Sequence, residues 1–331
     1  VKIKPAKNFK FMGIWFTPKL IAAAIKMPRK TVLVYCGNPR DITVLISSLL
    51  ARLLGKKVVF WGMFHSIGKS SLSSIIAFKL MALLGHQLFT YSKAGAIAQL
   101  ARGTSPSKVC LVGTGIKEPV INQLILKLSK VEIADMLGLS NKIMANTFVI
   151  THIMRLSKFK NSEKFINCCV ALSELKIDLV FLIVGGGEME NYIVSQLEKL
   201  GLSHLCVFTG PIYDSEKLQK IYQIADISLI PTCIGLSAHQ SLSYGVGVIT
   251  DDSLSEQTSE FEILTHNYNA LIYKENNYNH LKQCVRLVYG SSELKAKLAS
   301  NAKHSVEINS LNQKVANFKL GIENLLSRDL S

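Results

Sequence analysis

Arg155 and Lys160 stand five residues apart, between a predicted strand at 147–152 and a predicted helix at 162–175. A guanidinium can grip two oxygens of one anion, an ammonium adds a point charge, and a helix N-terminus favours negative charge. Together the two side chains and the start of the helix suit a diphosphate. A solvated basic turn would show the same residues, so this pair alone leaves both interpretations open.

Three consecutive glycines, Gly185, Gly186 and Gly187, end the next predicted strand. Glycine lets the backbone approach a ligand closely, so Gly185 and Gly186 are candidates for contact with a bound molecule. A dinucleotide fingerprint would need a further glycine where Glu190 stands, which disfavours NAD. The alternative is a strand-to-helix turn, and we expect that role for at least two of the three.

A third polar segment, 231–245, follows another predicted strand and runs into a helix. The backbone N–H groups of Gly235, Leu236 and Ser237 would lie at the helix N-terminus, where an anion is favoured. One turn further along, Gln240 could hydrogen-bond a ribose hydroxyl. The alternative is that Ser237 serves only as the helix N-cap.

Short β-branched runs alternate with amphipathic helical stretches, a pattern typical of βαβ units and parallel sheets. In the first half we expect strands at 31–35, 57–61, 87–91 and 108–112, and helices at 42–54, 72–84 and 93–102. In the second half we expect strands at 147–152, 179–184, 206–208, 227–230 and 248–250, and helices at 162–175, 189–200, 216–225, 238–244, 278–289, 292–308 and 311–326. The sequence therefore predicts an α/β fold of two Rossmann-like domains, 1–145 and 146–331, facing each other across a ligand-binding cleft. We expect the last helices to pack back on the first domain.

The composition excludes several classes of protein. With 331 residues, of which 48% are hydrophobic and 18% charged, the chain can bury two cores and does not have the composition of a disordered protein. No apolar run reaches the roughly 18 residues that a membrane span needs. The seven cysteines include no C-x-x-C pair, so neither zinc-ligand spacing nor a disulfide framework is supported.

The net charge of +15 is concentrated in the first half. Residues 1–145 carry 21 Lys and Arg against 4 Asp and Glu, whereas residues 146–331 carry 17 against 19. Aromatic residues lie among the lysines of the first 20 residues: Phe9, Phe11, Trp15 and Phe16. Such a surface attracts phospholipid headgroups, lipid diphosphates or nucleic acid, although no nucleic-acid reader motif is present. The alternative is a solubilising surface.

In this order and spacing, the three polar segments resemble the C-terminal domain of family 4 retaining glycosyltransferases, which have the GT-B fold. The family's G-R-L-x-x-x-K matches at Arg155 and Lys160, with Met154 in place of the glycine, and its V-G-x-G matches at 184–187. Further similarities are F-T-G at 208–210, the E-L helix at 216–218, A-D at 225–226, and N-A-L for the usual N-G-L at 269–271. In the first half, 60–62, 89–92 and 106–109 also resemble this family.

By this resemblance, Arg155 and Lys160 would bind the donor's diphosphate during catalysis, and the backbone at 235–237 would hold the phosphate or the sugar. The family also shows two glutamates separated by seven residues, and here those positions hold Thr232 and Gln240. Gln240 can still bind the ribose, whereas Thr232 cannot reproduce the charge that usually contacts the donor sugar. The identity of the donor therefore stays open.

His65 follows a predicted strand of the first domain, where the family often places a histidine near the donor sugar. By resemblance it would polarise or orient the reacting groups, and a surface loop residue is the alternative. A retaining front-face transfer needs no protein nucleophile, but it needs a neutralised leaving diphosphate and a positioned acceptor hydroxyl. No D-x-D motif is present, so we expect no metal cofactor. Only about 30 residues precede the first predicted strand, so the resemblance implies a shortened N-terminal domain.

The resemblance implies a glycosyltransferase of polysaccharide or glycoconjugate synthesis. Its partners would be a nucleotide diphosphate-sugar donor, a glycan or lipid-linked acceptor and an anionic membrane surface, but no nucleic acid. We expect it in the cytoplasm, attached peripherally to the inner face of the cell membrane. Two alternatives stay open: a nucleotide-sugar epimerase of the same fold, which would need carboxylates in the cleft, and a weak or inactive remnant that binds nucleotide, glycan or lipid.

Overall fold

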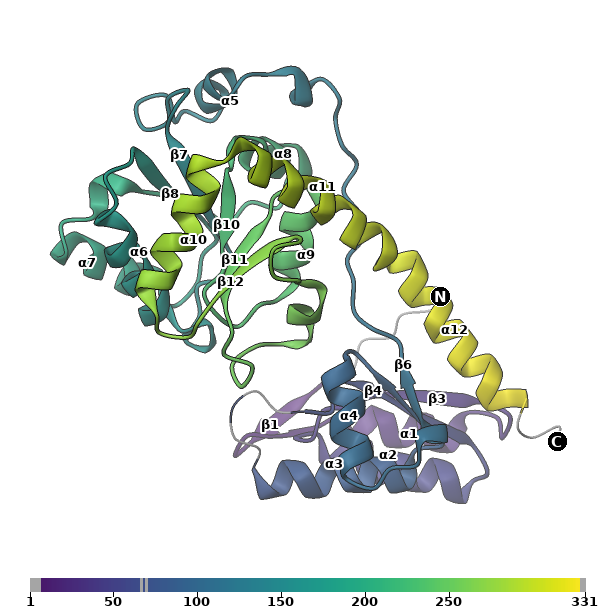
Figure 1. The fold of residues 1–331 in the computed structure, drawn as a ribbon. Coiled ribbons are helices and arrows are strands. Elements are labelled where there is room, and N and C mark those ends of the chain that lie inside the picture. Colours follow the sequence, from purple (N-terminus) through teal and green to yellow (C-terminus); the bar gives the residue numbers. More distant parts are fainter. Residues whose placement is uncertain (1–6, 66–67, 69–70, 328–331) are drawn as a thin grey trace. The chain divides into compact units, whose positions relative to one another are not determined.

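The computed structural model describes residues 7–65, 68 and 71–327. The chain forms two compact units: unit 1 comprises Val1–Thr114 with Asn312–Ser331, and unit 2 comprises Gly115–Leu311. The predicted α/β fold with two Rossmann-like halves is confirmed, because each unit is built on a parallel sheet with helices packed around it (Figure 1). Among the described residues, no helix has the length and apolar character to cross a membrane.

Unit 2 has a six-stranded, parallel sheet in the order β12-β11-β10-β7-β8-β9. Its strands are β7 (Phe148–Ile153), β8 (Leu179–Val184), β9 (Cys206–Gly210), β10 (Ile227–Leu229), β11 (Val248–Asp251) and β12 (Ala270–Tyr273). The first three strands extend from β7 in one direction, and the last three extend from β10 in the other. Ligands of doubly wound sheets bind at the carboxyl side of such a switch point, here between β7 and β10.

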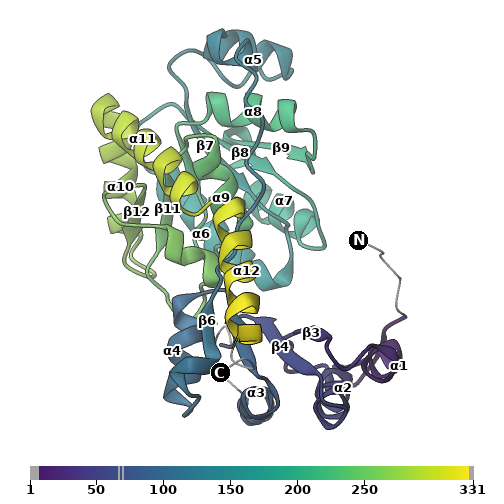
Figure 2. The same cartoon turned by 90° about the vertical axis from the view of Figure 1, so that its right-hand side faces the viewer.

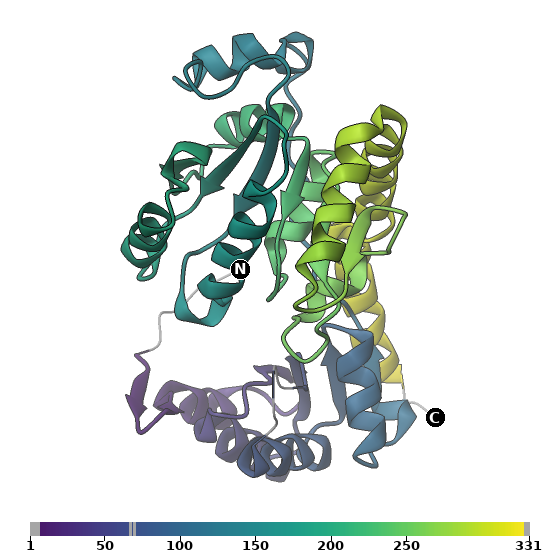
Figure 3. The ribbon, with the colours of Figure 1, turned by 60° about the vertical axis from the view of Figure 1, so that its left-hand side comes forward.

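Helices cover both faces of this sheet (Figure 3). They are α5 (Lys130–Met136), α6 (Ser162–Ser173), α7 (Glu190–Lys199), α8 (Ser215–Ile224), α9 (Leu236–Ser243), α10 (Tyr278–Gly290) and α11 (Ser292–Ile308). Alternate residues of β8 enter different cores: Phe181 and Ile183 join one, and Val180, Leu182 and Val184 join the other. All six residues of β8 are buried, as expected for a parallel strand with helices on both sides.

Unit 1 has a four-stranded parallel sheet in the order β3-β4-β5-β6. Its strands are β3 (Val32–Cys36), β4 (Lys57–Gly62), β5 (Gln87–Thr90) and β6 (Val109–Leu111), and its helices are α1 (Pro18–Lys26), α2 (Ile42–Leu53), α3 (Leu72–Leu84) and α4 (Lys93–Ala101). The four strands lie where the alternation of the sequence predicts them. One core between sheet and helices includes Phe60, Leu88, Phe78 and Met81.

A β-hairpin precedes this sheet, in a stretch where the sequence pattern predicted no element. β1 (Phe9–Phe11) pairs antiparallel with β2 (Ile14–Phe16), and Met12 and Gly13 form the two-residue turn with φ of 46° and 81°. Tight hairpin turns require such left-handed values, which glycine adopts easily and methionine rarely does. The aromatic residues of this stretch are therefore displayed on a hairpin.

The last helix, α12 (Leu311–Ser327), packs on unit 1 (Figure 2). Phe318 meets Trp61 and Phe89 edge-on, with ring centroids 5.4 and 4.9 Å apart. Leu325 is buried in the same cluster. A Cβ at Gly321 would lie 2.6 Å from the Phe89 ring, so the absence of a side chain there lets the helix approach the sheet closely.

The units divide the chain after Thr114, whereas the sequence pattern predicted a division after residue 145. Residues 115–145 lie with unit 2 because they contribute to its packing. Ile125 and Ile133 join its second core. Asn122 exchanges two hydrogen bonds with Gln219 of α8, at 2.8 and 2.9 Å.

Candidate functional site

The carboxyl ends of β7 and β10 lie side by side at the switch point of unit 2. β7 leads into the short helix η3 (Lys158–Lys160), and β10 leads into the loop before α9. His152 joins the two strands, because its Nδ1 lies 2.8 Å from the Leu229 carbonyl oxygen and its ring stacks on Phe165 at 3.8 Å. Burial lowers the pKa of His152 to about 4, so this histidine is a neutral core residue.

Lys160 connects the two loops. Its Nζ donates to the Cys233 carbonyl oxygen at 2.5 Å and lies 3.3 Å from the place that a Cβ on Gly235 would occupy. The Cys233 thiol in turn lies 3.2 Å from the Phe159 carbonyl oxygen. Burial lowers the pKa of Lys160, and the neighbouring Cys233 and Glu260 oppose this shift. The ammonium group therefore stands at the start of α9.

α9 begins at Leu236, and Gly235 is its N-cap. Ser237 is the second residue of the helix, so its alternative role as the N-cap is contradicted. Gly235 offers no side chain that could accept from the first N–H groups of α9, and such groups favour an anion. Lys160 and the start of α9 thus lie together in what we name the Lys160 arrangement, and binding of an anion there stays a prediction.

The glycines after β8 support the loop that carries Arg155. A Cβ at Gly185 would lie 1.9 Å from the Met154 carbonyl oxygen, and one at Gly187 would lie 2.3 Å from that of Leu156. Their φ values of 146° and 154° also favour glycine. This close packing accounts for two of the three glycines, while contact of Gly185 or Gly186 with a donor stays a prediction.

Two predicted catalytic residues lie on loops at strand ends. Arg155 is exposed, and its guanidinium has no hydrogen bond or ion pair with the part of the chain that the structure describes. His65 lies in unit 1, after β4, where it is half-buried and its Nδ1 is 3.1 Å from the Met63 carbonyl oxygen. A catalytic role for either residue stays a prediction.

The positions where the family shows its two glutamates have distinct surroundings. Gln240, on α9, accepts a hydrogen bond from the Tyr222 hydroxyl at 3.3 Å, and Tyr222 stacks on Tyr244 with centroids 4.8 Å apart. Thr232 is buried, and its Oγ1 donates to Glu256 Oε2 at 3.0 Å. A carboxylate therefore does lie beside position 232, although it comes from the segment after β11.

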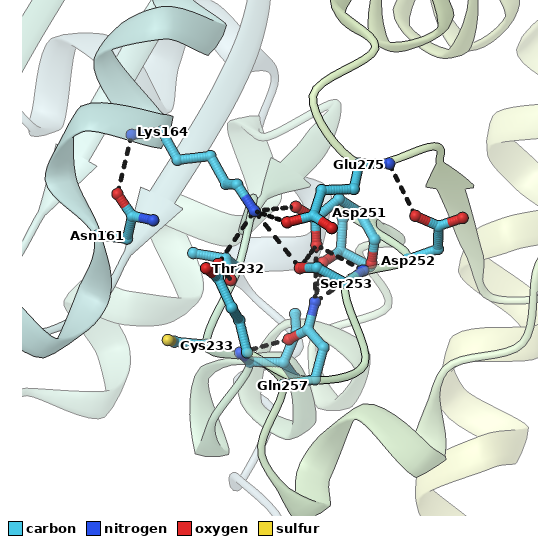
Figure 4. Close-up of polar contacts among 12 residues, drawn as sticks. Asn161, Lys164, Thr232, Cys233, Asp251, Asp252, Ser253, Gln257 and Glu275 are labelled. Atoms are coloured by element: carbon cyan, nitrogen blue, oxygen red, sulfur yellow. Dashed lines mark hydrogen bonds and ion pairs between the residues drawn. The ribbon is translucent and has the colours of Figure 1, made fainter. Parts of the chain in front are cut away.

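Glu256 belongs to a group of charged residues that we name the Lys164 cluster: Lys164, Asp251, Glu256 and Glu275. Figure 4 labels Lys164, Asp251 and Glu275 of this cluster. The Lys164 Nζ lies 2.5 Å from Asp251, 3.1 Å from Glu256 and 3.3 Å from Glu275. Asp251 ends β11 and Glu275 follows β12, so the cluster lies at the carboxyl edge of the sheet. Burial acts to lower the pKa of Lys164, but its bonds with Asp251 and Glu256 outweigh burial and raise it. Lys164 is therefore a cation at neutral pH.

The Lys164 cluster was not predicted from the sequence. A partial signal was present, because Asp251 and Asp252 come directly after a predicted strand. The sequence around Lys164 carries no such signal, since a single lysine on a helix usually faces solvent. Within residues 7–65, 68 and 71–327, no group of three or more His, Cys, Asp or Glu could hold a metal ion.

The chain is similar in sequence to known proteins over about half of its length. A family model described as "Glycosyl transferases group 1" matches residues 140–305. An uncharacterised glycosyltransferase of Methanocaldococcus jannaschii is 26% identical over 161 residues, which are 48% of this chain and 40% of that protein. The matched part is thus less than half of the length of this curated relative.

Solved structures share the fold over most of the chain. HepE of Anabaena in complex with UDP has a TM-score of 0.73 at 17% identity, covering 94% of this chain and 82% of that chain. The same protein is also solved with UDP-glucose. A glycosyltransferase from Rickettsia africae has a TM-score of 0.71 at 19% identity, covering 93% of this chain and 80% of that chain. At these identities the likeness shows the fold.

Proposed function

The chain belongs to the glycosyl transferases group 1 family, and from that membership we propose that it is a family 4-like, retaining glycosyltransferase. It takes a sugar from a nucleotide diphosphate-sugar and passes it to a glycan or lipid-linked acceptor, in polysaccharide or glycoconjugate synthesis. Unit 2 binds the donor. The reaction takes place in the cytoplasm, at the inner face of the cell membrane.

The observation that carries this proposal is the position of Lys160. Its ammonium lies against the Cys233 carbonyl oxygen and the N-cap of α9, at the switch point of a doubly wound sheet. A cation, a helix N-terminus and an exposed guanidinium on the same loop, that of Arg155, can together neutralise a diphosphate. A nucleoside diphosphate is the leaving group of every nucleotide diphosphate-sugar, and the charge that develops on it lies on its diphosphate.

Beyond neutralising the diphosphate, the reaction requires few groups from the protein. The bond between the sugar's anomeric carbon and the diphosphate breaks, the acceptor oxygen forms its bond on the same face, and the proton of the acceptor hydroxyl passes to the leaving diphosphate. Arg155 and Lys160 stabilise the charge that grows on the leaving oxygen, and no metal ion is required for that. Gln240 binds the ribose, the start of α9 with Gly235 holds phosphate or sugar, and His65 orients the reacting groups.

UDP is the first nucleotide to test, because HepE is solved with UDP and with UDP-glucose. We propose a thermal-shift screen of UDP, GDP, ADP, CMP and their sugars. A ligand that binds only the folded protein raises its melting temperature. The expected result is a shift with one nucleotide diphosphate that disappears in the double variant Arg155→Ala with Lys160→Ala.

A matched control removes two cations from the other edge of the same sheet. Lys176 and Lys199 are exposed and lie near the amino ends of β8 and β9. Lys176→Ala with Lys199→Ala should keep the shift, which shows that the loss is not due to net charge alone. No shift with any nucleotide in the wild-type protein would overturn the proposal.

We propose further that unit 1 binds an anionic membrane surface. Large apolar side chains are exposed on its helices: Ile42, Ile46, Leu49 and Leu53 on α2, and Leu72, Ile76, Leu80 and Leu83 on α3. Met12 and Ile14 of the hairpin border a groove of about 680 Å³ that includes residues of both helices. Residues 1–114 carry 17 Lys and Arg against a single acidic residue, Asp41. Exposed apolar groups on a part of the chain where cations far outnumber acids suit an interfacial surface.

Flotation with lipid vesicles tests this second part. Binding should be strong to vesicles that contain phosphatidylglycerol, weak to phosphatidylcholine alone, and weaker at high salt. Leu53→Ser with Leu83→Ser should reduce it, whereas Leu287→Ser with Ile308→Ser, two exposed apolar residues of unit 2, should not. Equal binding to both kinds of vesicle would refute the membrane proposal.

A further inference from the structure

Hydrogen bonds join the segment after β11 to the loop before α9 on both sides of one residue. The Thr232 hydroxyl donates to Glu256 at 3.0 Å, and the Ile234 N–H donates to the Gln257 side-chain oxygen at 2.9 Å. The residue between these bonds is Cys233, whose carbonyl oxygen binds the lysine that we assign to the diphosphate. Glu256 therefore lies in the immediate neighbourhood of the Lys160 arrangement.

The carboxylates of the Lys164 cluster are not equivalent. Asp251 is fully buried, and protein donors that include Lys164 and Ser253 bond to both of its oxygens. The side chains of Glu256 and Glu275 are 37% and 40% exposed. The cluster holds three carboxylates and one ammonium, so its two exposed members carry charge that the cluster does not neutralise.

Only one exposed carboxylate of the cluster also contacts the loop before α9. Lys164, which is 6% exposed, and Thr232 both donate to Glu256 Oε2. Burial acts to raise the pKa of Glu256, but these two bonds outweigh burial and lower it. Glu256 is thus an ionised acceptor held in a fixed orientation, and Lys164 is the residue that positions it.

A nucleotide diphosphate-sugar needs two kinds of partner at neighbouring places. Its diphosphate needs cations and N–H donors, and its sugar ring needs strong acceptors for several hydroxyl groups. A carboxylate is the strongest such acceptor in proteins. The Lys160 arrangement supplies the first kind and Glu256 supplies the second.

We propose that Glu256 accepts hydrogen bonds from hydroxyl groups of the donor's sugar and thereby determines which sugar the protein takes. This inference rests on the proposed function and names a specificity-determining residue within it. Glu275, which contacts Lys164 but not Thr232, has no such role. Lys164 acts through Glu256 as a positioning residue.

The test compares binding of UDP with binding of UDP-glucose, UDP-galactose and UDP-N-acetylglucosamine by calorimetry. In the wild-type protein, one sugar nucleotide should bind more tightly than the others. Glu256→Gln keeps the shape of the side chain and removes its charge. It should weaken that sugar nucleotide roughly 10- to 100-fold and leave the affinity for UDP within about twofold.

Glu275→Gln is the matched control, because it removes a second carboxylate from the same ammonium. It should leave both affinities unchanged. Glu256→Asp keeps the charge but shortens the side chain by one methylene, so it should retain preference for a sugar nucleotide over UDP at reduced affinity. This variant also tests the proposal if Glu256→Gln does not fold, since unaltered affinity for the sugar in Glu256→Asp counts against a direct contact.

The outcomes separate the two proposals. If neither UDP nor any sugar nucleotide of the thermal-shift screen binds the wild-type protein, the proposed function has failed. If they bind and Glu256→Gln behaves like Glu275→Gln, the proposed function stands and the role of Glu256 is overturned. A loss of UDP affinity equal to the loss of sugar-nucleotide affinity would also overturn it, because the residue would then act on the fold of the site.

Discussion

Units 1 and 2 differ in their balance of charge and in the partners of their buried lysines. Unit 1 carries 20 Lys and Arg against 3 Asp and Glu, whereas unit 2 carries 18 against 20. In unit 2 the buried Lys164 is bonded to Asp251, a full charge. In unit 1 the buried Lys56 is bonded to the backbone carbonyl oxygens of Ala24 and Ile25, which are only dipoles.

This difference indicates two uses of positive charge. In unit 2 cations and carboxylates nearly balance in number, and Arg155 and Lys160 lie together on one loop. In unit 1 the 20 Lys and Arg far outnumber the 3 Asp and Glu, so the positive charge belongs to the surface as a whole. We therefore interpret the positive charge on the loop of Arg155 in unit 2 as part of a local site. The positive charge of unit 1 instead creates an electrostatic field that extends over its surface.

The largest effect is expected from removal of the two buried ammonium groups. Lys164→Met should destabilise unit 2 by about 3–5 kcal/mol, because it leaves Asp251 buried and without its cation. Lys56→Met should cost unit 1 about 1–3 kcal/mol, because only carbonyl groups lose a partner. Urea unfolding followed by circular dichroism reports on the whole chain. Tryptophan fluorescence reports on unit 1 alone, since Trp15 and Trp61 both lie there.

A second substitution sharpens this test. Asp251→Asn added to Lys164→Met should recover part of the lost stability, because the unpaired charge is then gone. Equal costs for Lys56→Met and Lys164→Met would show that the two units do not differ in the way described.

A smaller effect is expected on how the free energy of unfolding depends on pH. The pKa of His152 is lowered to about 4 by burial, so the folded protein keeps this ring neutral while the unfolded chain protonates it near pH 6.5. Its stabilising contribution is complete above pH 6.5 and is lost as the pH falls towards 4, by roughly 3 kcal/mol in total. His152→Asn should flatten the decline of unfolding free energy between pH 7 and pH 4.5. An unchanged slope would contradict this.

The smallest effect distinguishes the histidines of the two units. Burial lowers the pKa of His86 in unit 1 to about 4, and the cations Arg52, Lys57 and Lys108 add to the shift. Because salt screens charges and not burial, high salt should raise the pKa of His86 by roughly 0.3 and move that of His152 less. NMR titration of the ring protons at two salt concentrations measures both. Equal shifts would mean that the field of unit 1 does not reach His86.

The repeating elements of both units could be predicted from the sequence, because buried parallel strands leave a local trace. The strand at Leu179–Val184 is a continuous apolar run with both faces covered, and it lies where the pattern predicts it. The hairpin at the start left a weaker trace. Its turn requires the backbone of Met12 to adopt the left-handed conformation, which methionine rarely does.

The candidate site could be predicted only where its residues are close in sequence. Arg155 and Lys160 share one loop, so their spacing indicated a shared task. Lys164 and Asp251 are far apart in the sequence, and each has an ordinary explanation when taken alone. Thr232 stands where the family shows a glutamate, so the sequence predicted that a negative charge is missing there. The structure places Glu256, from another segment, beside Thr232. Pairing of that kind depends on the sheet, which no local pattern encodes.

Unit 1 is assembled from two stretches of chain that leave the ribosome at different times. Its strands emerge early, but Phe318 and Leu325, which complete the core around Phe89, emerge only after all of unit 2 has been made. Unit 2 is one continuous stretch and can close as soon as it is synthesised. Unit 1 therefore begins to be translated before unit 2 but is finished after it, and in the interval the apolar face that Phe318 and Leu325 will cover is open to chaperones.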